Sequence, residues 1–173
     1  MLSRKSGCTC LRFAALALVY LSSHAFAQTP QTLHVTVEGQ PALTLDRAAL
    51  AAMPRVDIAT AAIHHQAAAR WQGVALSELL RRAGAPTGES LRGRAMATVV
   101  RVAAADHYQV VFSLGELDSS LGHEQVIVAD TQDGHPLQGD GPFRLIVPGD
   151  QRPARWVRNV VAIEAANDAP QAP

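Results

Sequence analysis

Residues 128–157 read VADTQDGHPLQGDGPFRLIVPGDQRPARWV, and this stretch decides the fold. Two clusters of turn-forming residues, at 131–134 and 137–142, interrupt it. Apolar runs rich in β-branched and aromatic residues adjoin the turns and predict strands over 125–129, 143–147 and 156–164. The stretch therefore predicts short strands joined by turns, with no long helix between them.

The rest of the chain continues this pattern. A short helix should start at an Asp46 cap and run to Met53, a second should cover Ala75–Ala83, and one helical turn should cover 114–117. Alternating apolar residues predict further strands over 32–37, 42–45, 55–63, 98–103 and 108–112. Because strands and helices do not alternate regularly, we expect an α+β fold with mixed β-sheets and a few short helices.

The N-terminus has the three parts of a secretory signal peptide. Arg4, Lys5 and Arg12 form a basic start, an apolar run covers 13–21, and residues 25–27 form a small-x-small cleavage site. We therefore expect a signal peptide over 1–27 and a periplasmic or secreted protein. No twin-arginine pattern is present, which favours export in the unfolded state. The mature chain should form one domain over 28–166, with a disordered tail over 167–173.

Cleavage after Ala27 would leave a mildly acidic chain without cysteine. Both cysteines, Cys8 and Cys10, precede the cleavage site. All twelve remaining basic residues are arginines, against 15 Asp and Glu, which gives a formal net charge of −3. This balance argues against nucleic acid as a partner. We also expect no membrane association once the signal peptide is removed.

Three segments, taken in order, resemble the oxidoreductase molybdopterin-binding domain of the sulfite oxidase family. They are residues 71–84, residues 106–114, and the stretch from 128 to 157 with its Asp-Gly-x-Pro-Leu and Gly-Pro-x-Arg-x-x-x-Pro-Gly turns. The resemblance covers about 71–164. It implies that Tyr108 is an active-site tyrosine near the metal, that Arg144 contacts the pterin phosphate, and that Arg155 stands where the family has a lysine near the cofactor.

The sequence also departs from the family. The family's molybdenum is held by a cysteine thiolate, whereas the corresponding stretch, Ala59–His65, offers only two imidazoles. Asp140 stands where the family has a histidine, and an acidic group there would oppose anion binding. The signal peptide lacks the pattern used to export preloaded molybdoenzymes. We therefore expect no cofactor, although the resemblance by itself implies molybdopterin.

Two functions from different classes follow. The preferred one is a binding module that has lost the cofactor and uses Tyr108, Arg144 and Arg155 to bind a small anion or a partner protein. The alternative is a molybdopterin-dependent oxidoreductase that catalyses oxygen-atom transfer, with Tyr108 assisting at the metal.

Each site residue also has a structural interpretation. Tyr108 could be an ordinary strand tyrosine, and the two arginines could pair with Asp140 or Asp150 in the turns. Trp71 and Trp156 are expected in the core, and Glu116 and Asp118 on a solvated face. His64 and His65 could bind metal only if the backbone is irregular, because neighbours on a strand point to opposite faces.

Overall fold

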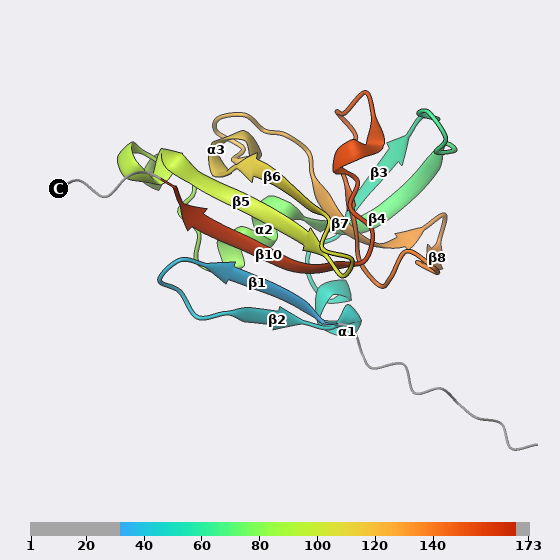
Figure 1. Ribbon diagram of the computed structural model, residues 1–173, viewed down its shortest axis with the longest axis horizontal. Helices are drawn as coiled ribbons and strands as arrows, with labels where there is room; N and C mark the ends of the chain where they lie inside the picture. Colours follow the sequence, from blue (N-terminus) through green and yellow to red (C-terminus); the bar gives the residue numbers. More distant parts are fainter. Residues whose placement is uncertain (1–31, 169–173) are drawn as a thin grey trace, which may run out of the picture.

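The computed structural model describes residues 32–168, which form two five-stranded sheets (Figure 1). The signal peptide expected over 1–27 lies outside these residues, as do residues 169–173 of the tail expected over 167–173. The first sheet has the order β2-β1-β10-β5-β6. The second has the order β3-β4-β7-β8, and β9 also pairs with β7. The mixed sheets with few short helices confirm the expected α+β class.

Alternation along the strands of the first sheet separates its two faces. The strands are β1 (Leu33–Val37), β2 (Leu43–Leu45), β5 (Thr98–Ala104), β6 (Gln109–Ser113) and β10 (Val160–Asn167). Leu33, Val35 and Val37 are buried, whereas His34 between them is exposed. β1 runs parallel to β10, with His34 opposite Ala162, and the other pairs in this sheet are antiparallel. The sheet is therefore mixed.

The second sheet contains a β-bulge at a glycine. Its strands are β3 (Val56–Thr60), β4 (Ala69–Ala75), β7 (Ile127–Gln132), β8 (His135–Pro136) and β9 (Arg144–Ile146). The register between β4 and β7 shifts between Gln72 and Gly73. A Cβ atom on Gly73 would lie 2.2 Å from the carbonyl oxygen of Val128, so the two backbones approach as closely as they do only because residue 73 has no side chain.

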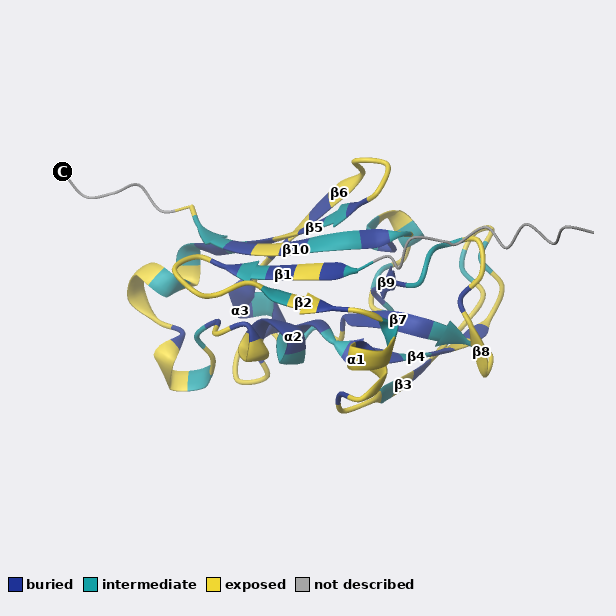
Figure 2. Ribbon diagram, turned by 90° about the horizontal axis from the view of Figure 1, so that it is seen from below, coloured by how far each residue is buried: buried dark blue, intermediate teal, exposed yellow. Residues whose placement is uncertain are grey.

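The core lies between the two sheets, which form the two layers of Figure 2. Helix α1 (Arg47–Ala51) begins as expected at Asp46, whose side chain accepts a hydrogen bond from the Ala49 amide. Helix α2 (Leu76–Arg82) buries Leu76, Leu79 and Leu80, the apolar face that the sequence predicts. Helix α3 (Leu114–Leu117) is the expected single turn. Among the described residues, no helix is long and apolar enough to span a membrane.

Several predicted boundaries are wrong. The strand predicted over 55–63 ends at Thr60, and the one predicted over 156–164 begins only at Val160. The residues just before Trp156, Pro153–Arg155, form a short 3₁₀ helix, η3, that starts at a proline. β10 also continues through Asn167, so the prediction that the tail begins at 167 is wrong. Two more 3₁₀ helices, η1 (Gly88–Ser90) and η2 (Gly93–Ala97), precede β5.

Glu78 on α2 should make the stability of the fold depend on pH. Hydrogen bonds from Arg81 and Arg82 hold the pKa of Glu78 at about 2, below its ordinary value of 4.5. This stabilisation is complete above pH 4.5 and is lost as the pH falls towards 2. Both arginines are largely exposed, so we expect the two ion pairs together to contribute less than about 1 kcal/mol to the free energy of unfolding.

Urea unfolding of the wild type and of Glu78→Gln between pH 6 and pH 2 measures this effect. The difference in unfolding free energy between the two should shrink as the pH falls through this range. Glu89→Gln, on an exposed residue, is the matched control and should show a smaller difference at every pH. A constant difference between the wild type and Glu78→Gln would contradict the prediction.

Candidate functional site

The turn that precedes β9 fixes the position of Arg144. Gly139 and Gly141 have φ values of +80° and +78°, which suit glycine. The Asn159 amide donates a 2.7 Å hydrogen bond to the Asp140 carbonyl, which ties this turn to the residues before β10. A Cβ on Gly141 would overlap the side-chain oxygen of Asn159. The turn is therefore closely packed, and Arg144 follows it as the first residue of β9.

Arg144 is only 4% exposed, and its guanidinium group contacts other residues of the protein. Nη1 donates to Asp140, and Nη2 donates to Gln66 Oε1 at 3.2 Å. The guanidinium carbon lies 5.0 Å from the centre of the Trp71 ring, a cation–π geometry. Burial lowers the pKa of Arg144, and Asp140 opposes that shift. The buried Nε has no hydrogen-bond partner among the described residues.

Arg155 is held by two carboxylates. Nε and Nη2 donate to the two oxygens of Asp150, and Nη1 donates to Glu116 Oε1 at 3.2 Å. The guanidinium also lies over the Phe112 ring, 4.7 Å from its centre. The two hydrogen bonds that Arg155 donates to Asp150 raise the pKa of Arg155. The alternative interpretation, in which Arg144 pairs with Asp140 and Arg155 with Asp150, is thus observed for both.

Tyr108 lies in the turn before β6 with its side chain outside the core. The residue is 49% exposed, and its hydroxyl donates a 2.6 Å hydrogen bond to the carbonyl of Ala154, next to Arg155. The bond connects the β5–β6 turn to η3. Tyr108 and Arg155 therefore lie in one region of the molecule. Arg155 is the last residue of η3, and Tyr108 bonds the residue before it.

A pair of tryptophans connects this region to Arg144. Trp71 and Trp156 meet edge to face with ring centres 6.0 Å apart, and both are buried in the core, as expected. The Arg144 guanidinium stacks over the ring of Trp71, and Trp156 directly follows Arg155 in the sequence. The chain thus brings the three candidate residues near one tryptophan pair, but each guanidinium faces its own carboxylates and no shared ligand position.

The expectation of a solvated face at Glu116 and Asp118 is wrong. Glu116 is half-buried and bonds Arg155, and it also closes a capping box with Ser113. Asp118 is buried and accepts hydrogen bonds from the Ser120 hydroxyl and from the Gly88 amide, which lower its pKa. The Ser113-x-x-Glu116 capping pattern is a sequence signal that could have placed Glu116 correctly.

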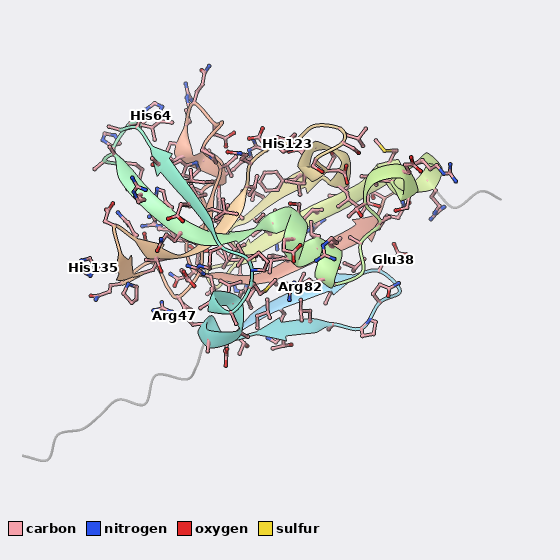
Figure 3. The ribbon with its side chains drawn as sticks, turned by 180° about the vertical axis from the view of Figure 1, so that it is seen from behind. Glu38, Arg47, His64, Arg82, His123 and His135 are labelled. Atoms are coloured by element: carbon pink, nitrogen blue, oxygen red, sulfur yellow. The ribbon has the colours of Figure 1, made fainter. Side chains whose placement is uncertain are left out.

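The histidines do not form a metal site within residues 32–168. His64 and His65 occupy a turn between β3 and β4, not a strand, and His64 has φ +50°. Figure 3 shows His64, His123 and His135 well apart from one another. No group of three or more His, Cys, Asp or Glu in this described part of the chain could hold a metal ion.

The sequence model of the family described as "Oxidoreductase molybdopterin binding domain" matches residues 23–173. The chain belongs to this family. The match extends the resemblance beyond residues 71–164 to the whole described structure. No curated protein matches the chain.

A solved structure supports the same fold. The sulfane dehydrogenase SoxCD from Paracoccus pantotrophus superposes with a TM-score of 0.62 at 19% sequence identity. The match covers 86% of this chain but 41% of the SoxCD chain, so this molybdopterin-binding-type domain spans about two fifths of that protein's length. At this identity the likeness concerns the fold alone.

The described residues do not fit a molybdenum held by thiolate. The sequence has no cysteine after Cys10, and no acidic or imidazole cluster replaces it within the described part. The two arginines that the resemblance assigns to the cofactor are already paired with Asp140, Asp150 and Glu116.

Tyr108→Phe tests whether the hydroxyl serves the loop. Loss of the bond to Ala154 should lower the unfolding free energy by about 0.5–1 kcal/mol and should speed amide exchange over 150–156. Hydrogen exchange read by mass spectrometry measures the second effect. Gln109→Ala, on the exposed neighbour, should leave exchange in 150–156 unchanged. If Tyr108→Phe also leaves it unchanged, the hydroxyl does not hold the loop.

Proposed function

We propose that the chain is an exported domain of the molybdopterin-binding family that works without thiolate-bound molybdenum and docks a partner protein. The observation that carries the proposal is the pairing of Arg144 and Arg155 with carboxylates of the same chain. A small anion would have to displace Asp140, or both Asp150 and Glu116, from these guanidinium groups. A partner protein has no such competitor, because it can use the exposed surface.

Exposed apolar side chains support this choice. Among the described residues the exposed large hydrophobic side chains are Met96, Tyr108, Val111 and Leu121. Val111 lies on β6, an edge strand of the first sheet, and Tyr108 directly precedes that strand. Met96 and Leu121 both approach Gly115 of α3, the helix that follows β6. Apolar groups beside an open strand edge are typical of an interaction surface.

The family match favours a second candidate, a molybdopterin-dependent oxidoreductase that catalyses oxygen-atom transfer. In that case a group other than thiolate would complete the metal's coordination. Elemental analysis separates the two functions. Full-length protein with its signal peptide, expressed in its native host with ample molybdate, should carry no stoichiometric molybdenum after purification. Stoichiometric molybdenum would overturn the cofactor-free proposal.

Site-specific photo-crosslinking in the native host tests the docking role. A photoreactive residue at Val111 should give one discrete crosslinked product, which Leu121→Glu should abolish. The same residue at His34, exposed on β1, is the control and should not give this product. Saturable sulfate or phosphate binding that Arg155→Gln abolishes, with no crosslink at Val111, would instead support a small-anion function.

A further inference from the structure

A small hollow of about 160 Å³ lies between β3 and the loop that leads from α3 to β7. Its lining includes neither residue of the tryptophan pair and neither of the two arginines. Most of its wall is apolar. Its polar lining residues are two serines, Gln125, and the adjacent His123 and Glu124. The apolar wall consists of Val56, Ile58, Ala75, Leu117, Val126 and Ile127.

The position of β3 at the sheet edge leaves the hollow open. β3 pairs with β4 on one side, and within the described residues no strand covers its other side. Val56 and Ile58 alternate onto the same face of this strand. They therefore form an apolar wall that no further strand of the described chain completes.

The opposite wall is a loop held in one conformation. The Gly122 amide bonds the Gly115 carbonyl, the His123 amide bonds Asp118, and the Glu124 amide bonds Glu116. His123 has φ +51°, which turns the chain between two of these bonds. A Cβ on Gly122 would lie 2.5 Å from Glu116 Cα, so only glycine permits this contact. The hollow is therefore preformed.

Glu124 gives the hollow its charge. The residue is half-buried, and its carboxylate forms no hydrogen bond or ion pair with any described side chain. Glu124 lines the hollow, and its Oε1 lies 2.7 Å from the position that a Cβ atom on Gly149 would take. Arg155, which follows Gly149 in the same loop, is already bonded to Asp150 and Glu116. Glu124 thus remains available to an external cation.

A second hollow of about 280 Å³ continues from the first. Ser77 and Ser119 line both of them. The second hollow also contains Glu78 and Asp118, against one arginine, Arg81. Arg82 also bonds Glu78, so two guanidinium groups compensate that carboxylate. Glu124, which no described side chain pairs with, therefore supplies the negative charge that favours a positively charged ligand in the first hollow.

We propose that the first hollow binds a small organic ammonium ion with an apolar body. A cavity of about 150 Å³ accommodates one aromatic ring, so the volume suits a ligand of that size. The apolar body contacts Val56, Ile58 and Leu117, while the ammonium group donates to Glu124 and to the hydroxyl of Ser119. This site goes beyond the docking role, because it uses none of the residues assigned to the partner surface.

Amide chemical-shift titration of the folded domain tests the proposal with three matched probes at pH 7.5. They are phenethylammonium, the neutral 2-phenylethanol, and the anion phenylacetate. Phenethylammonium should bind saturably with a Kd on the order of millimolar and should shift the amides of Ala75, Ser77 and His123. The neutral probe should bind at least about fivefold more weakly, and the anion should not bind.

Two variants separate charge from shape. Glu124→Gln should remove the preference for the cation, whereas Glu164→Gln, an equal charge change on the exposed face of β10, should leave it unchanged. Ala75→Val, which fills the hollow, should weaken both the cation and the neutral probe. Equal binding of all three probes, binding that maps to other residues, or no saturable binding by any probe would each overturn the proposal.

Discussion

Replacing Gly73 by alanine should lower the unfolding free energy by about 3 kcal/mol or more. A methyl group there would meet the Val128 carbonyl oxygen at 2.2 Å and Ala129 Cα at 2.6 Å. Both atoms belong to the backbone of β7 in the middle of the second sheet, so neither can move aside as a flexible side chain would. Relief requires β4 and β7 to separate, which breaks ladder hydrogen bonds. Urea unfolding followed by tryptophan fluorescence measures the loss, because Trp71 lies two residues away on β4.

Gly139→Ala is the matched control. Gly139 has φ +80° but no atom within 4 Å of its would-be Cβ. Alanine there should lower the unfolding free energy by about 1 kcal/mol through backbone strain alone. Because Gly73 has no positive φ, the comparison separates close approach from conformational preference. Equal losses at the two positions would contradict the steric account of the bulge.

Local sequence signals predicted the strands and helices of this fold better than they predicted which strands pair with one another. Alternation in 32–37 identifies β1 and its buried face, and the Asp46 cap identifies the start of α1. No local pattern shows that β1 pairs in parallel with β10, more than a hundred residues away, because alternation defines faces but not neighbours. The strand predicted from Trp156 failed for a related reason. Trp156 is buried as a strand residue would be, but it follows a proline-started 3₁₀ turn.

The candidate site shows the same division. Asp140 lies four residues from Arg144 and Asp150 lies five from Arg155, so both pairs could be anticipated as turn contacts. Gln66 and Glu116 contact the same arginines from distant segments, and no local pattern predicts these two contacts. The family resemblance identified residues of interest but not the direction of their side chains. Tertiary packing of the loops decides that direction.

The ammonium site was beyond sequence reasoning altogether. His123 and Glu124 adjoin each other in a polar segment that reads as a solvated turn. They line a hollow only because three backbone bonds fold that segment back over α3. The other wall comes from β3, more than sixty residues earlier in the chain. Neither composition nor residue spacing can predict a contact between segments so far apart in the sequence.

Arg144→Ala should lower the unfolding free energy by about 2–4 kcal/mol, whereas Arg144→Met should stay within about 1 kcal/mol of the wild type. Alanine removes the stem that packs on Trp71 and leaves Gln66 and Asp140 without their donor. Methionine keeps most of the volume. It also removes a desolvated cation whose Nε is unsatisfied, and replacing a buried ion pair by an apolar side chain is often neutral. Asp140 keeps a second cation, Arg158, at 3.7 Å.

Arg158→Met on the exposed partner is the control and should change the unfolding free energy by less than about 0.5 kcal/mol. A loss in Arg144→Met as large as in Arg144→Ala would mean that the fold itself needs the buried charge. If Arg144→Met is stable and still crosslinks through Val111, the charge serves neither the fold nor the docking surface. A stable variant that no longer crosslinks would instead mean that the buried charge of Arg144 is needed for docking although not for the fold.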